Sequence, residues 1–170
     1  AGFADHDGDA STLCDSCSVG HYAGVGATVC TPCAGGEYDD DGDASTVCVT
    51  CSVGYFSPGT ALTCTVCPAG FHDNDADPST PCDNDASKCP AGTYSVPGST
   101  SCAACAAGRL DHDSRPSTPC HACDLGTYSA ASQTTCASCT AGQADADRDP
   151  STPCTLCIDG SSSAIKATTC

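Results

Sequence analysis

Cysteine is the residue type in this chain with the most reactive side chain, and it recurs at regular intervals. Nineteen of the 170 residues are Cys, separated by repeating steps of 3, 13, 3 and 15 residues, which gives a period of 34. The one slip lies between Cys82 and Cys89, where a step of 7 replaces a step of 3. This density is typical of a disulfide scaffold, and the fixed period predicts an array of small stacked units. Because disulfides persist in oxidising compartments, we expect an extracellular or cell-surface, secreted protein.

Two other thiol chemistries use Cys-x-x-Cys spacing. Zinc is bound by such pairs, but three features argue against it here. The pair at Cys82 and Cys89 is opened by residues 83–88, the chain lacks a basic face, and the ladder offers no natural four-ligand grouping. Thioredoxin-like redox chemistry is disfavoured because no helix-forming segment follows any of the pairs.

The pairing that we favour closes each module on itself. It leaves only Cys14 over, and its partner is expected before Ala1, because Ala1-Gly2-Phe3 matches Ala69-Gly70-Phe71. Whichever cysteines pair, we expect the chain to be a fragment of a longer protein. The bridges of this sequential scheme are Cys17 with Cys30, Cys33 with Cys48, Cys51 with Cys64, Cys67 with Cys82, Cys89 with Cys102, Cys105 with Cys120, Cys123 with Cys136, Cys139 with Cys154, and Cys157 with Cys170.

A competing scheme pairs alternate cysteines. It begins with Cys14 to Cys30 and Cys17 to Cys33, and it leaves Cys157 unpaired instead. Sequence alone does not fix disulfide connectivity, so both schemes stay open at this point.

Each module also repeats a glycine, and six of the nine modules add an aromatic ring. Gly follows a Cys by three positions in all nine modules, which indicates a need for positive φ or for close approach of another chain segment. These residues are Gly20, Gly36, Gly54, Gly70, Gly92, Gly108, Gly126, Gly142 and Gly160. A ring stands close behind in six modules, and we expect it to be the small core of its module, packed on the disulfide. The rings are Tyr22, Tyr38, Phe56, Phe71, Tyr94 and Tyr128.

These patterns predict small disulfide-rich repeats in an elongated rod of short β-strands and turns. Almost no helix and little hydrophobic core are expected, since the chain has no Trp or Met and only five Tyr and three Phe. The expected divisions are 1–14 (the C-terminal part of a truncated module), 17–50 (repeat 1), 51–88 (repeat 2, with the insertion 83–88), 89–122 (repeat 3), 123–156 (repeat 4) and 157–170 (the first half of repeat 5).

The module sequence resembles two families of extracellular repeats. Cys89-Pro90-Ala91-Gly92-Thr93-Tyr94, closed by Cys102, is similar to the ephrin-receptor-like cysteine-rich repeat and to the first small module of tumour-necrosis-factor-receptor repeats. Growth-factor-like (EGF-like) repeats are a more distant match, because their interleaved six-cysteine spacing is missing. The resemblance covers the whole chain and implies disulfide-laddered rods without enzymatic activity.

The longer modules carry a stripe of alternate aspartates before the closing Cys. Alternate Asp residues would share one face of a strand, or supply the first ligands of a calcium loop. Arg115 takes the third place in one stripe, and no Glu stands eleven residues after the first Asp of any stripe. A solvated acidic edge that keeps strands from mispairing is the alternative to calcium. The calcium candidates are Asp5, Asp7, Asp9, Asp39, Asp41, Asp43, Asp73, Asp75, Asp77, Asp145, Asp147 and Asp149, while Asp111 and Asp113 belong to the stripe with Arg115.

Charge limits the partners of the chain. The formal net charge of −16 excludes nucleic acid as a natural partner, since no basic patch can be drawn. We expect no direct membrane insertion in this segment and no cofactor other than calcium. Self-association into an array or filament is expected, with a protein ligand as a further candidate partner.

Nothing in the sequence predicts an enzyme. The five histidines (His6, His21, His72, His112 and His121) are scattered over turn-rich segments, and we expect exposed polar side chains there. No phosphate-binding loop or nucleophile elbow is present.

Two non-enzymatic functions follow from these observations. Near-identical modules favour a structural protein, a stalk or a self-assembling surface filament, over a receptor or adhesion ectodomain that binds a protein ligand. Pro-Ser-Thr-Pro runs make it a candidate glycoprotein, because no N-linked sequon exists. The O-glycosylation candidates are Ser79, Thr80, Ser117, Thr118, Ser151 and Thr152.

Overall fold

The computed structural model describes residues 1–9 and 11–170. They form two compact units, each described by itself: unit 1 holds Ala1–Pro68 and Asp73–Ser87, and unit 2 holds Ala69–His72 and Lys88–Cys170. The regular elements within the described residues are strands of two residues each, with no helix. Accordingly, this part of the chain contains no helix long and apolar enough to cross a membrane.

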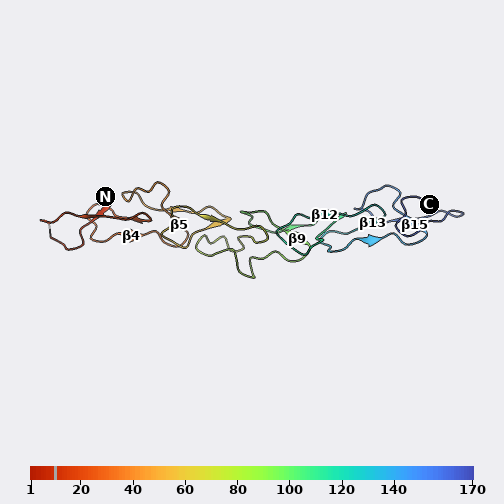
Figure 1. The fold of residues 1–170 in the computed structure, drawn as a ribbon, viewed down its shortest axis with the longest axis horizontal. Coiled ribbons are helices and arrows are strands. Elements are labelled where there is room, and N and C mark those ends of the chain that lie inside the picture. The colour runs from red at the N-terminus through yellow and green to blue at the C-terminus, as the bar shows by residue number, and fades with distance from the viewer. Residues whose placement is uncertain (10) are drawn as a thin grey trace. The chain divides into compact units, whose positions relative to one another are not determined.

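The strands pair as antiparallel hairpins that follow one another in chain order within each unit (Figure 1). The first strand of a hairpin follows the module's Gly, and the second is the dipeptide between the closing Cys and the next opening Cys. Unit 1 contains β1 (Phe3–Ala4) with β2 (Asp15–Ser16), β3 (His21–Tyr22) with β4 (Thr31–Pro32), β5 (Glu37–Tyr38) with β6 (Val49–Thr50), and β7 (Tyr55–Phe56) with β8 (Thr65–Val66). Unit 2 contains β9 (Thr93–Tyr94) with β10 (Ala103–Ala104), β11 (Arg109–Leu110) with β12 (His121–Ala122), β13 (Thr127–Tyr128) with β14 (Ala137–Ser138), and β15 (Gln143–Ala144) with β16 (Thr155–Leu156).

Nine disulfides close the modules on themselves, with Cα–Cα distances of 5.3 to 5.9 Å. The pairs are those of the sequential scheme, and Cys14 is exposed and free. Short modules span 13 residues and are closed by Cys17–Cys30, Cys51–Cys64, Cys89–Cys102, Cys123–Cys136 and Cys157–Cys170. Long modules span 15 residues and are closed by Cys33–Cys48, Cys67–Cys82, Cys105–Cys120 and Cys139–Cys154. The predicted class, small disulfide-rich repeats of short strands, is therefore confirmed.

The core consists of sulfur and small side chains. Nine cysteines together with Ala4, Ala23 and Ala144 make up the buried apolar residues of the described chain. The aromatic rings that we expected as the core of each module, such as Tyr22 and Tyr94, are only half-buried. Two-residue strands are too short to enclose a ring, so that expectation was wrong, and the disulfides hold the centre instead.

The recurring glycines meet both predicted needs. All nine have positive φ, between 73° and 89°. A Cβ on Gly20 would lie 2.5 Å from the carbonyl oxygen of Thr60, and a Cβ on Gly36 would lie 3.1 Å from the backbone nitrogen of Ser79. Both neighbours belong to the next module of the same length. Short modules therefore approach short modules, and long modules approach long modules, through a gap that only glycine fits. The glycines at these approaches are Gly20, Gly36, Gly70, Gly92, Gly108 and Gly126, whereas Gly142 and Gly160 have nothing within 4 Å of an added Cβ.

The insertion 83–88 leaves the repeat in register. The N–H of Cys89 donates to the carbonyl of Gly70 at 2.9 Å, as Cys33 does to Gly20 in an uninterrupted module. An isolated bridge between Phe71 and Lys88 replaces the hairpin there.

Candidate functional site

The first Asp is a buried carboxylate in four of the five stripes, whereas Asp5 in the first stripe is half-buried. Asp39, Asp73, Asp111 and Asp145 are only 5 to 7% exposed. In each, one carboxylate oxygen accepts the N–H of the glycine of the preceding short module: Gly20 to Asp39 at 2.9 Å, Gly54 to Asp73 at 2.9 Å, Gly92 to Asp111 at 3.1 Å, and Gly126 to Asp145 at 3.0 Å. The first Asp thus fastens its long module to the short module before it.

The second oxygen of the first Asp shapes the stripe itself. In Asp39 it accepts the N–H of Gly42 at 2.8 Å, and in Asp73 it accepts the N–H of Ala76 at 2.8 Å. Glycine and alanine there have positive φ, 69° and 55°. One short carboxylate therefore bonds to two backbone segments at once. This explains why the position holds Asp, since Glu would push the oxygens one methylene further out.

The middle Asp of each stripe is a local acceptor. Asp41 accepts the hydroxyl of Thr46 at 3.0 Å and the N–H of Asp43 at 2.8 Å. The same hydroxyl bond joins Asp7 to Thr12, Asp75 to Thr80, Asp113 to Thr118, and Asp147 to Thr152. These bonds fold the stripe and the following Ser-Thr pair into one turn.

The third Asp caps that turn. The hydroxyl and the N–H of Ser79 both donate to Asp77, which lowers the pKa of the Asp77 carboxyl. The pKa of Asp43 is lowered in the same way, with the N–H of Ser45 as the larger cause. Where Arg115 replaces the third Asp, its carbonyl still accepts the N–H of Thr118 at 3.0 Å. The turn therefore forms without the third carboxylate.

The stripes do not bring three metal ligands together. Among the described residues, the only group of three whose ligand atoms lie within 4.8 Å of one another is His72, Cys89 and Cys102. These two cysteines form a disulfide and have no thiolate to donate. The hydrogen bonds above give the stripe carboxylates a structural task, and calcium at the stripes stays a prediction.

Sequence reasoning missed the bond from glycine to aspartate. Its signal was present: the glycine of a short module and the first Asp of the next stripe are always 19 residues apart, as in Gly92 and Asp111. A constant spacing between a backbone donor and a short acceptor indicates a geometry that recurs along the array. The period of the cysteines alone does not reveal this geometry.

The hydroxyl groups predicted to carry sugars differ in their surroundings. Ser79, Ser117 and Ser151 are exposed. The threonines beside them, Thr80, Thr118 and Thr152, are half-buried, and their hydroxyls donate to the middle Asp of the stripe. A glycan on a threonine would remove this donor, and a glycan on Ser79 would remove the hydroxyl bond to Asp77, so Ser117 and Ser151 are the candidates whose modification would disturb neither bond.

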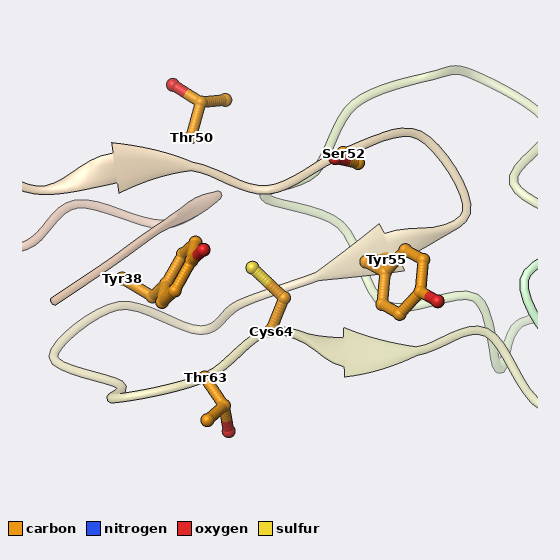
Figure 2. A pocket seen from close by; sticks show the side chains of 6 residues that line it. All are labelled: Tyr38, Thr50, Ser52, Tyr55, Thr63 and Cys64. Carbon is orange, nitrogen blue, oxygen red and sulfur yellow. The ribbon is translucent and has the colours of Figure 1, made fainter. Parts of the chain in front are cut away.

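An open pocket of about 410 Å³ lies in unit 1. Figure 2 shows the Tyr38 ring beside the side chain of Cys64, with the Tyr55 ring on the other side of that cysteine. Thr50, Ser52 and Thr63 complete the lining. The lining offers aromatic faces and hydroxyls, without a carboxylate, imidazole or amine for acid–base chemistry near neutral pH.

The repeated unit of this chain is a tandem module closed by a disulfide, and seven of the nine such modules in the described residues contain a short two-stranded hairpin. Many disulfides of this kind fit a secreted or extracellular protein. Compared with known proteins, the chain matches no family model and no curated protein.

Proposed function

We propose that this chain is a structural extracellular protein that forms a stalk or assembles into a surface filament. The observation that carries the proposal is the repetition of the same inter-module contacts. The glycine-to-aspartate bond recurs between short and long modules, and the glycine gap recurs between modules of equal length. Repeats that contact only near neighbours can be added without changing the contacts already made.

Exposed apolar side chains and free strand edges support association between chains. Leu13 is 97% exposed, Val25 is 92% exposed and Ile158 is 80% exposed. Strands β5 and β11 each use one edge in an isolated bridge, Tyr38 with Ala61 and Leu110 with Gln133. A hairpin edge without such a bridge is a template for pairing with another chain. The net charge of −16 opposes such contacts, so divalent cations such as calcium would promote them by screening the outward carboxylates of the stripes.

O-linked sugars fit this role. Ser117 and Ser151 are exposed beside prolines, where a glycan would extend into solvent without disturbing the Thr-to-Asp bonds. Intact mass of the native protein tests this part directly, because an unmodified mass would contradict it.

Electron microscopy of the native, non-reduced protein tests the proposal, first with calcium and then with a chelator. Ordered filaments would support the structural function, and their loss in the chelator would assign the cation dependence. Isolated particles in both conditions would contradict the proposal that the chain assembles into a filament.

A receptor or adhesion ectodomain is the second candidate, and the uneven charge of the two units favours it. Unit 1 holds 14 of the 21 acidic residues and no Lys or Arg, whereas unit 2 holds 7 acidic residues and all 5 Lys and Arg. The resemblance to ephrin-receptor-like and tumour-necrosis-factor-receptor-like repeats agrees with a protein ligand, and the charge of unit 1 suits a basic one. Saturable binding of labelled chain to cell surfaces, competed by unlabelled chain but not by polyaspartate, would support this function.

A further inference from the structure

Two histidines from one hairpin of unit 2 lie side by side. Leu110 in β11 pairs with His121 in β12, and His112 stands two residues after Leu110. The two histidines are therefore diagonal neighbours on one face of the hairpin. Their ring centroids are 5.3 Å apart, with the ring planes inclined by 51°. The adjoining bridges Cys105–Cys120 and Cys123–Cys136 anchor both strands.

We propose that His112 and His121 bind one divalent transition metal ion, such as Zn²⁺, Ni²⁺ or Cu²⁺, through one imidazole nitrogen each. Imidazole is a preferred ligand of these ions. With metal–nitrogen bonds of about 2.0–2.1 Å and a tetrahedral angle, two imidazole centroids that share an ion lie roughly 5.2 Å apart. The observed separation of 5.3 Å matches this value, so the rings reach a shared ion by rotating, without movement of the backbone.

The surroundings supply further oxygen ligands. A carboxylate oxygen of Asp113 lies 3.9 Å from Nε2 of His112. The two histidines also line a cavity of about 310 Å³ together with Asp124 and Lys166. Neither carboxylate forms a group of three ligand atoms within 4.8 Å with the two histidines. Water, or a carboxylate after rotation of its side chain, can therefore fill the positions that two nitrogens leave open. Lys166 is the one permanent cation of this lining, and Asp124 is its one carboxylate.

The array provides its own comparison. The two positions, one after the first Asp of a stripe and one after the closing Cys, recur along the chain. They hold His6 and Asp15, Asp40 and Val49, Asn74 and Asp83, and Ala146 and Thr155. Two imidazoles meet only at His112 and His121, so the site belongs to one module rather than to the repeat.

Calorimetric titration of the full chain with ZnCl₂ at neutral pH, with the Cys14 thiol blocked by iodoacetamide, tests the proposal. One Zn²⁺ should bind per chain, and His112→Gln or His121→Gln should each weaken it at least tenfold. His21→Gln is the matched control and should leave the affinity unchanged. Affinity should fall as the pH is lowered, because a protonated imidazole cannot ligate. Zinc binding that is absent from the unsubstituted chain, or that survives both substitutions, would overturn the proposal.

A second site, built into another module, tests the geometry in a way that misfolding of a histidine variant cannot imitate. The combined change Ala146→His and Thr155→His places two imidazoles at the equivalent positions of the next long module. The stoichiometry should rise from one Zn²⁺ to two, with new zinc-dependent shifts of imidazole signals in NMR spectra. A stoichiometry that stays at one would contradict the geometry on which the site depends.

Discussion

Long and short modules share a disulfide and a hairpin but hold their neighbours by different means. A long module contributes a side chain, the buried carboxylate of Asp39, to the N–H of Gly20 in the short module before it. A short module contributes backbone: Ser57 accepts the N–H of Gly36 at 2.8 Å and donates to the carbonyl of Pro78 at 2.9 Å. The difference teaches that the boundary before a long module adds a buried carboxylate to its backbone bonds, whereas the boundary after a long module uses backbone bonds and, at Ser95 and Ser129, a serine hydroxyl.

The largest loss of stability is expected from a substitution that blocks the close approach of one short module to the next short module. A Cβ on Gly92 would collide with the carbonyl of Ser132, so Gly92→Ala should destabilise the chain by about 2–4 kcal/mol through strain at positive φ and overpacking. Gly160→Ala is the matched control. Gly160 has the same role and a φ of 87°, but in this chain nothing lies within 4 Å of its added Cβ. Denaturant unfolding without reductant should show a much smaller loss for the control, and equal losses would contradict the predicted approach.

The second-largest loss of stability is expected from removing the buried carboxylate that joins a long module to the short module before it. Asp39→Ala should cost about 1.5–3 kcal/mol, because the N–H groups of Gly20 and Gly42 lose a charged acceptor. Asp40, the exposed neighbour of Asp39, provides the control substitution Asp40→Ala, which should change stability by less than about 0.5 kcal/mol. Urea unfolding of both variants measures the difference. Similar stability of the two variants would show that the buried carboxylate does not hold the modules together.

A smaller change of stability is expected from relieving backbone strain within a short module. Thr60 has a φ of 54°, which is costly for a β-branched residue, while the equivalent positions hold Gly26 and Gly98. Thr60→Gly should therefore stabilise the chain by about 1 kcal/mol. The reverse change, Gly26→Thr, should destabilise it by a similar amount. A shift of the thermal midpoint in the wrong direction for either variant would contradict this account of the turn.

The smallest effect concerns the cap of a long module. Hydrogen bonds from Ser79 lower the pKa of Asp77, so the cap contributes stability above the ordinary aspartate value of about 4. That contribution is lost as the pH falls through the lowered pKa. Carbon NMR titration should find Asp77 ionising below the ordinary range, and Ser79→Ala should raise its pKa toward it. If the titration midpoint of Asp77 is the same in the variant, the hydrogen bonds from Ser79 are not the cause of the lowered pKa.

The sequence predicted a disulfide-rich repeat of short strands because its cysteines recur at a fixed spacing, while it left two schemes of disulfide pairing open. The period of the cysteines and the recurring glycines predicted the modules, the short strands and the positive φ of residues such as Gly20. The core was predicted wrongly, because a ring count does not tell how much of a ring a two-residue strand can cover. Tyr22 stays half-buried for that reason.

The candidate sites were predictable only in part. Alternate aspartates look alike in sequence, yet Asp39 is buried and bonded to a distant glycine while Asp41 bonds to a nearby threonine. The meeting of His112 and His121 depends on the register of β11 and β12, which no local pattern reveals. Contacts between modules follow from the three-dimensional stacking, which a linear period constrains but does not specify.

The central claim is that a buried aspartate fastens each long module to the short module before it. Amide hydrogen exchange in calcium-free buffer tests this claim most directly at the donors Gly20, Gly54, Gly92 and Gly126. The account predicts slow exchange at all four amides, and in Asp39→Ala faster exchange at Gly20 while Gly92 and Gly126 stay protected. Exchange of these amides at the rate of an unprotected peptide would contradict it.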